Sequence, residues 1–194
     1  ALRYPDVVVP MKRISVTDDG LVEVPGIGTL ALTPWSQSQL ARMLGIRWEK
    51  WFSSSVVSPT ERKEEIERRL SRLSGEWKIR ATRYGRGENA HGEGILRAFL
   101  GASYEPIDDS RVFTRMTYIL GGRASDLRFV RCEVTDKFAY YVALDIREVD
   151  LGRKDPDVHH NGFILVNSEV GAGALSIMEY LWRLLCMNGL ILLS

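Results

Sequence analysis

The segment 127–149 constrains the fold of this 194-residue chain more than any other stretch. Every second position of its later half carries a large apolar side chain: Phe138, Tyr140, Val142, Leu144 and Ile146. Alternation with a period of two is typical of a strand that buries one face. Because Thr135 and Asp136 supply turn-forming side chains just before it, the segment predicts an antiparallel hairpin.

Start and stop signals predict helices earlier in the chain. Thr33 in front of Pro34 predicts a helix start, and Gly45 predicts a left-handed helix end. The tetrapeptide Ser-Pro-Thr-Glu at 58–61 has the pattern of a capping box and opens a heavily charged helix. Both helices are predicted from residues within a few positions of their ends.

Strands and helices follow one another irregularly along the rest of the chain. We expect a strand at 76–85, a strand and turn at 95–107, strands at 163–168 and after Gly189, and a helix at 108–122. This order predicts an α+β fold in a single domain over residues 1–194, with a mixed or antiparallel sheet of hairpins packed against helices. Since the chain starts without Met and stops on ILLS inside a predicted strand, we also expect a fragment of a longer chain.

Composition excludes several classes of protein. Hydrophobic residues make up 45% and charged residues 26% of the chain, which is ordinary for a globular protein and excludes wholesale disorder. The net charge of +1 exerts no overall attraction on nucleic acid or membrane. Residues 78–131 nevertheless carry ten basic and six acidic side chains, and residues 132–194 carry five and nine. This split predicts a basic face beside an acidic one, with local ion pairing as the alternative. The ratio of 20 arginines to 6 lysines suits a thermophilic or GC-rich source.

Cys132 and Cys186 are too few for a disulfide framework, and both lie in apolar surroundings. We therefore predict buried, reduced thiols and a cytoplasmic protein. The apolar run 174–193 is long enough to raise the question of a membrane span, but polar or glycine residues interrupt it: Glu179, Arg183, Asn188 and Gly189. A core helix over 174–187 followed by a strand is the expected structure, so no membrane partner is predicted.

A glycine-spaced turn precedes that expected helix. Asn167 and Ser168 end a predicted strand, and Gly171 and Gly173 follow them. Backbone N–H groups of a turn that opens a helix can hold an anion, so these four residues form a candidate anion-binding turn. The alternative is a tight corner in which small residues let the helix pack closely on its own strand. A dinucleotide fingerprint is excluded because Ser176 stands where a third glycine is required.

The segment 155–159 holds the candidate metal ligands. In an extended chain Asp155, Asp157 and His159 share one face, where two carboxylates and an imidazole can bind a divalent cation. A nuclease-like enzyme is the corresponding function, and a polar surface loop is the alternative. The spacing of a nucleophile and its base is not recognisable, so we assign no catalytic residue and no cofactor, and we favour a non-enzymatic protein while the metal-dependent enzyme stays open as the alternative.

Basic and aromatic side chains gather on two predicted strands. They are Trp77, Lys78, Arg80, Arg83, Tyr84 and Arg86 on the first strand and its exit, and Arg128 and Arg131 on the hairpin. Arginines on a strand face can follow a phosphate backbone while aromatic rings stack on unpaired bases, so these residues predict binding of single-stranded DNA. The alternative is a solvated face that pairs with the acidic helix at 61–67.

Two further motifs resemble a known family. The first is LRAFLGASYEPIDD, which has a basic residue, a small turn, a tyrosine and an acidic residue, with matches at Arg97, Tyr104 and Asp108. The second joins NSEVGAGAL to LCMNGL, with matches at Asn167, Ser168, Gly171, Cys186, Asn188 and Gly189. Over residues 95–190, the chain resembles the phage- and plasmid-related family of unknown function found on bacterial mobile elements. It departs from that family at Gly101, where Ser is common, and at Ser103, where a basic residue is common.

The resemblance implies a mobile-element protein that works near DNA replication or recombination. A hairpin-rich sheet backed by helices is also similar to single-strand annealing proteins of recombination. With Arg97 from the first motif added to the basic residues, the predicted function is DNA binding or strand annealing by a homo-oligomer. The alternatives are the metal-dependent enzyme and a structural domain whose apolar helix at 174–187 forms an oligomer.

Overall fold

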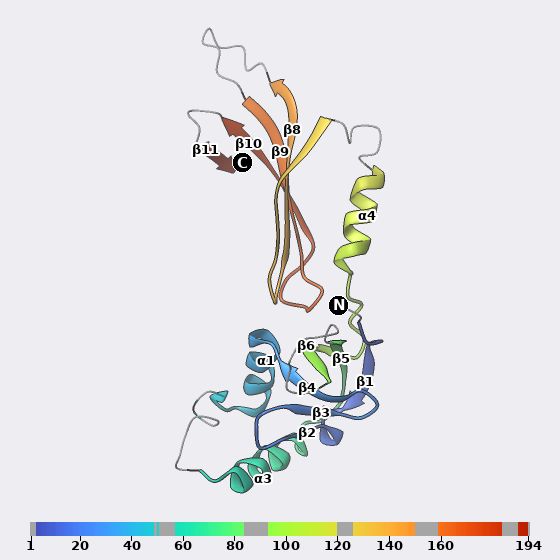
Figure 1. The fold of residues 1–194 in the computed structure, drawn as a ribbon, viewed down its shortest axis with the longest axis vertical. Coiled ribbons are helices and arrows are strands. Elements are labelled where there is room, and N and C mark those ends of the chain that lie inside the picture. Colours follow the sequence, from blue (N-terminus) through green and yellow to red (C-terminus); the bar gives the residue numbers. More distant parts are fainter. Residues whose placement is uncertain are drawn as a thin grey trace. The chain divides into compact units, whose positions relative to one another are not determined.

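The computed structural model describes residues 3–48, 50, 57–83, 93–119, 126–149, 159–183 and 190–193. The chain divides into two compact units, Ala1–Glu105 (unit 1) and Pro106–Ser194 (unit 2), each with its own sheet (Figure 1). The sheet of unit 1 is mixed and that of unit 2 is antiparallel, and helices accompany both. The predicted α+β class is confirmed, and the assignment of both units to a single domain stays a prediction.

Unit 1 contains a six-stranded sheet in the order β1-β5-β6-β4-β3-β2. Its strands are β1 (Val7–Pro10), β2 (Ser15–Val16), β3 (Val22–Val24), β4 (Gly28–Leu32), β5 (Glu76–Arg83) and β6 (Gly94–Gly101), and the short helix η1 (Met11–Arg13) links the first two. The β4–β6 pair is parallel, and the other neighbouring strands are antiparallel. A parallel pair needs a crossover connection, and the connection from β4 to β6 contains the two long helices that the structure describes in this unit.

The helices of unit 1, α1 (Pro34–Leu44) and α3 (Pro59–Leu70), start where their capping residues predict. The Thr33 side chain accepts a hydrogen bond from the Ser36 N–H, and Gly45 ends α1 with a φ of 63°. The Ser58 capping box is closed in both directions. Each helix buries one apolar stripe in the core of unit 1, which includes Leu40, Ile66 and Leu70.

Unit 2 contains a five-stranded antiparallel sheet in the order β11-β10-β9-β8-β7. Its elements are α4 (Asp109–Ile119), β7 (Leu127–Val134), β8 (Ala139–Val149), β9 (His159–Asn167), β10 (Ser176–Arg183) and β11 (Leu190–Leu193). β7 and β8 form the predicted hairpin. Helix α4 packs on one face of the sheet, where Val112 and Met116 join Tyr141 and Leu165 in a buried cluster. We call this the helix face, and the other side the open face.

The predicted core helix over 174–187 is wrong, because Ser176–Arg183 forms strand β10 and the residues from 184 on lie outside the described ranges until β11. All of β10 pairs with β9, from Ser176 opposite Val166 to Arg183 opposite His159. A short apolar run fits a helix or a strand equally well by its periodicity, and here the neighbouring strand decides.

Cys132 is exposed rather than buried as predicted, because β7 is an edge strand whose side chains on both faces reach solvent. Cys186 lies outside the described residues. Within the part of the chain that the structure describes, no helix combines the length and the apolar character needed to cross a membrane.

Gly162→Ala tests how β10 is seated on β9. Without a side chain at Gly162, the Tyr180 ring reaches across β9 and its hydroxyl donates to the Ala143 carbonyl at 3.1 Å. A Cβ at this position would lie 2.6 Å from that carbonyl oxygen and closer still to the ring, so we expect unit 2 to lose about 1–3 kcal/mol of unfolding free energy. Urea denaturation measures the loss. Gly101→Ala is the control, since a Cβ there meets nothing within 4 Å, and equal stabilities would contradict this account.

Candidate functional site

Two basic side chains of β5 that were predicted to bind DNA lie close to carboxylates of unit 1 instead. Arg80 is fully buried, and its Nε lies 3.5 Å from Asp6 Oδ1. The Lys78 side chain is only 12% exposed, and its Nζ lies 3.8 Å from Glu105 Oε1. The prediction of DNA binding requires Arg80 to lie on an exposed strand face. That placement is wrong, because β5 lies between β1 and β6 and three consecutive residues, 79–81, are buried.

The other candidate DNA-binding residues that the structure describes in unit 1 do not form an exposed row of positive charges. Trp77 packs half-buried against the core, and the Arg83 guanidinium lies 4.6 Å from the centroid of the Tyr4 ring. Arg97 is half-buried in β6. Tyr84 and Arg86 lie outside the described residues.

Arg128 and Arg131 lie exposed on β7 in unit 2. Their Cα partners on β8 are Leu144 and Val142, so both side chains project from the open face. Arg131 pairs with Glu133, and Arg131 and Tyr140 are among the residues that line a cavity of about 500 Å³ on this face. Of the candidates that the structure describes, these two arginines share an exposed strand face.

The polar side chains of the predicted anion-binding turn form hydrogen bonds with other residues of the same chain. Asn167 is 2% exposed and donates to the Ile107 carbonyl at 2.8 Å and to Asp109 Oδ1 at 2.7 Å. Ser168 is 3% exposed and donates to the Lys137 carbonyl at 2.7 Å. These bonds fasten the end of β9 to the start of α4 and to the turn between β7 and β8.

The surroundings of the turn favour a tight corner over an anion cradle. Glu169 Oε1 accepts a hydrogen bond from the Asp109 N–H at 2.7 Å, so carboxylates already lie at the start of α4. Gly171, with a φ of 69°, turns the chain, and Gly173 leaves room for the Phe138 ring. The turn leads into a strand, so the helix dipole that would attract an anion does not follow it.

The part of the chain that the structure describes does not show the three candidate metal ligands next to one another. Asp155 and Asp157 lie outside those residues. His159 is 4% exposed and belongs to β9, opposite Arg183, rather than to the predicted polar loop. Among the described side chains, no group of three or more His, Cys, Asp or Glu is placed to hold a metal ion.

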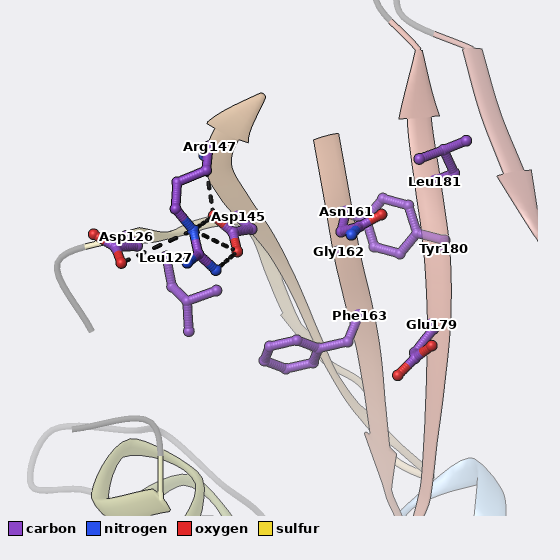
Figure 2. Close-up of a pocket in the computed structure, with 10 residues that line it drawn as sticks. All are labelled: Asp126, Leu127, Asp145, Arg147, Asn161, Gly162, Phe163, Glu179, Tyr180 and Leu181. Atoms are coloured by element: carbon purple, nitrogen blue, oxygen red, sulfur yellow. Dashed lines mark hydrogen bonds and ion pairs between the residues drawn. The ribbon is translucent and has the colours of Figure 1, made fainter. Parts of the chain in front are cut away.

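A cavity of about 540 Å³ with several charged side chains lies on unit 2, lined by residues of β8, β9 and β10 and by the start of β7 (Figure 2). Arg147 Nε donates to Asp145 Oδ1 at 2.8 Å and lies 4.0 Å from Asp126 Oδ2. The hydrogen bond to Asp145 raises the pKa of Arg147. With Glu179 the lining has three carboxylates to one guanidinium, so the cavity favours cationic over anionic ligands. The sequence does not reveal this cavity, because its lining residues come from separate strands and meet only when those strands pair.

A second cavity of unit 2, about 380 Å³ in volume, lies between α4 and strands β9 and β10. We call it the α4 groove. Its apolar lining consists of Ile107, Val112, Met116, Phe163, Leu165, Leu175 and Ile177. Two cations also line it, Arg111 and Arg115, which lie one helical turn apart. The groove is thus an apolar surface bordered by positive charge.

Comparisons of the chain with models of protein families, with curated proteins and with solved structures find no match. The resemblance to the phage- and plasmid-related family therefore stays a prediction. The surface of unit 2 around the α4 groove and the neighbouring part of β10 is the candidate site.

Asn167→Ala tests the structural role of the turn. The substitution removes the donor that joins β9 to the start of α4, so we expect a loss of about 1–3 kcal/mol in the unfolding free energy of unit 2. Urea denaturation measures it, with Asn161→Ala, an exposed position on the same strand, as the control. If added phosphate stabilised the parent chain but not the Asn167 variant, the turn would be an anion cradle instead.

Proposed function

We propose that this chain is an assembly protein, which binds copies of itself through unit 2. The observation behind the proposal is the distribution of exposed apolar side chains. Of the eleven large apolar side chains that are exposed among the described residues, ten belong to unit 2 and only Val8 belongs to unit 1. The ten are Ile107, Phe113, Tyr118, Phe129, Val130, Val134, Ile146, Leu175, Ile177 and Met178. Apolar surface concentrated in this way is typical of a protein–protein interface.

A group of exposed apolar side chains at the start of β10 adds a second reason. Leu175, Ile177 and Met178 lie within four positions of one another and are 42%, 66% and 43% exposed. Neighbouring apolar side chains that remain exposed are typical of a surface that a partner covers.

Met178→Lys tests the assembly function. We expect light scattering of the full chain to give a mass that rises from one chain to at least two over a concentration series, and the lysine to shift it towards one chain. The reason is that a charge placed in a contact between two copies has to be desolvated when they bind. Val8→Lys is the matched control, since Val8 and Met178 are each 43% exposed and Val8 lies in unit 1. A mass of one chain at every concentration of the parent protein would remove the proposal.

We also propose single-stranded DNA binding along β7 as a second function. The observation that favours it is the shared exposed face of Arg128 and Arg131, beside the cavity to which Tyr140 contributes. Guanidinium groups at these positions can contact successive phosphates while the tyrosine ring stacks on a base. The pairing of Arg131 with Glu133 opposes this function, because the carboxylate competes with phosphate for the guanidinium.

An Arg128→Ala, Arg131→Ala double variant tests the second function. Fluorescence anisotropy with a labelled single strand is expected to show weaker binding and a flatter dependence of log affinity on log salt, by about 0.7 for each lost phosphate contact. Arg72→Ala, an exposed position of unit 1, is the control. Binding by the parent chain that is absent at low salt, or that ignores salt, would exclude this function.

A further inference from the structure

We propose that the α4 groove binds a small amphipathic anion, an alkyl carboxylate, with its chain on the apolar floor and its carboxylate against Arg111 and Arg115. This ligand site lies within one chain and goes beyond the proposed assembly function.

The floor of the groove is apolar. Val112 and Met116 of α4 are each 7% exposed, and Leu165 of β9 is 3% exposed, in the buried cluster where the helix meets the sheet. Phe163 packs against the same cluster. None of these side chains carries a strong hydrogen-bonding group, so the part of a ligand that lies on them has to be apolar.

The border of the groove on the side of α4 is cationic. Arg111 and Arg115 directly precede the buried Val112 and Met116 in the sequence. A step of one residue turns a helix by about 100°, so the arginines lie beside the floor and stay exposed. Arg115 lies over the Tyr118 ring, 5.5 Å from its centroid, and neither arginine has a carboxylate partner among the described residues. Both guanidinium groups can therefore bind an anion.

An apolar floor with a cationic border matches an amphipathic anion. At the exposed border a carboxylate accepts charge-assisted hydrogen bonds from the guanidinium groups without being buried. An alkyl chain on the floor removes apolar surface of both molecules from water. The two arginines disfavour a cation, and they are too few for the row of phosphate contacts that a nucleic acid strand makes.

The volume of the groove sets the size of the ligand. Because an apolar cavity of about 150 Å³ holds benzene, the groove, at about 380 Å³, has room for a molecule roughly two to three times as large. A straight-chain carboxylate such as decanoate is of this size. A protein partner would cover about 800 Å² on each side, which is far more surface than the groove offers.

The groove is preformed at the end where α4 begins. Ile107 and Leu175 line it and are 41% and 42% exposed, so a ligand that covers them removes further apolar surface from water. The Ile107 carbonyl accepts a hydrogen bond from Asn167 at 2.8 Å, and this bond fixes the chain that leads into α4. A site that is already in place loses little conformational entropy when a ligand binds.

Calorimetric titration of the full chain with decanoate, below its micelle concentration, tests the site. We expect one decanoate per chain, and we expect the uncharged analogue decanol to bind about tenfold or more weakly, because it lacks the charge that the guanidinium groups attract. Binding of several molecules per chain without saturation, or equal affinities for decanoate and decanol, would overturn the proposal.

Removing the two cations tests the position of the carboxylate. Arg111→Ala with Arg115→Ala is expected to weaken decanoate binding about tenfold or more and to leave decanol binding nearly unchanged. Arg128→Ala with Arg131→Ala removes the same charge from the open face and is the matched control. Equal losses in the two double variants would be an effect of net charge and would exclude the groove as the site.

Filling the groove tests the position of the alkyl chain. Leu175→Trp places a larger ring among the lining residues and is expected to abolish binding of both decanoate and decanol. Val134→Trp is the control, because Val134 is 62% exposed and does not line the groove. Circular dichroism confirms that each variant is folded. Unchanged binding by the Leu175 variant would place the ligand elsewhere and contradict the proposal.

The same titration on Met178→Lys separates ligand binding from assembly. Met178 lies on the open face with Arg131, away from the groove, and its lysine variant is expected to be a single chain. Saturable decanoate binding by this variant supports the ligand site, whether or not the parent chain assembles. If neither protein binds decanoate, the ligand site is wrong, and the mass of the parent chain alone decides the assembly function.

Discussion

The pairing of β10 with β9 is the interaction on which the rest of unit 2 depends. Gly162 gives the Tyr180 ring the space to reach Ala143 on β8, and this contact ties the three strands together. An apolar segment that a helix would have buried is spread along a sheet, where its side chains point to both faces. Leu175 and Ile177 thereby become part of the α4 groove. The exposure of Ile177 and Met178 is thus a consequence of strand pairing.

The position of α4 depends in turn on the corner that follows β9. Asn167 holds the residues that start α4, and Ser168 holds the turn of the β7–β8 hairpin, so two neighbouring buried side chains join three parts of unit 2. A motif that looks suited to ligand binding in the sequence serves here as a structural junction. Arg111 and Arg115 are carried by α4, so their place beside the groove follows from these hydrogen bonds as well.

Features that depend on neighbouring residues could be predicted from the sequence, and features that depend on distant ones could not. The Thr33 cap, the Gly45 helix end and the Ser58 capping box involve residues within four positions and are confirmed. The hairpin at 127–149 is also confirmed, because its turn is local: the Thr135 N–H donates to the Phe138 carbonyl three residues on. The burial of Arg80 beside Asp6 and the strand conformation of Ser176–Arg183 are decided by segments far away in the sequence, which alternation alone does not reveal. The α4 groove likewise combines a helix with two strands, so its residues share no local pattern.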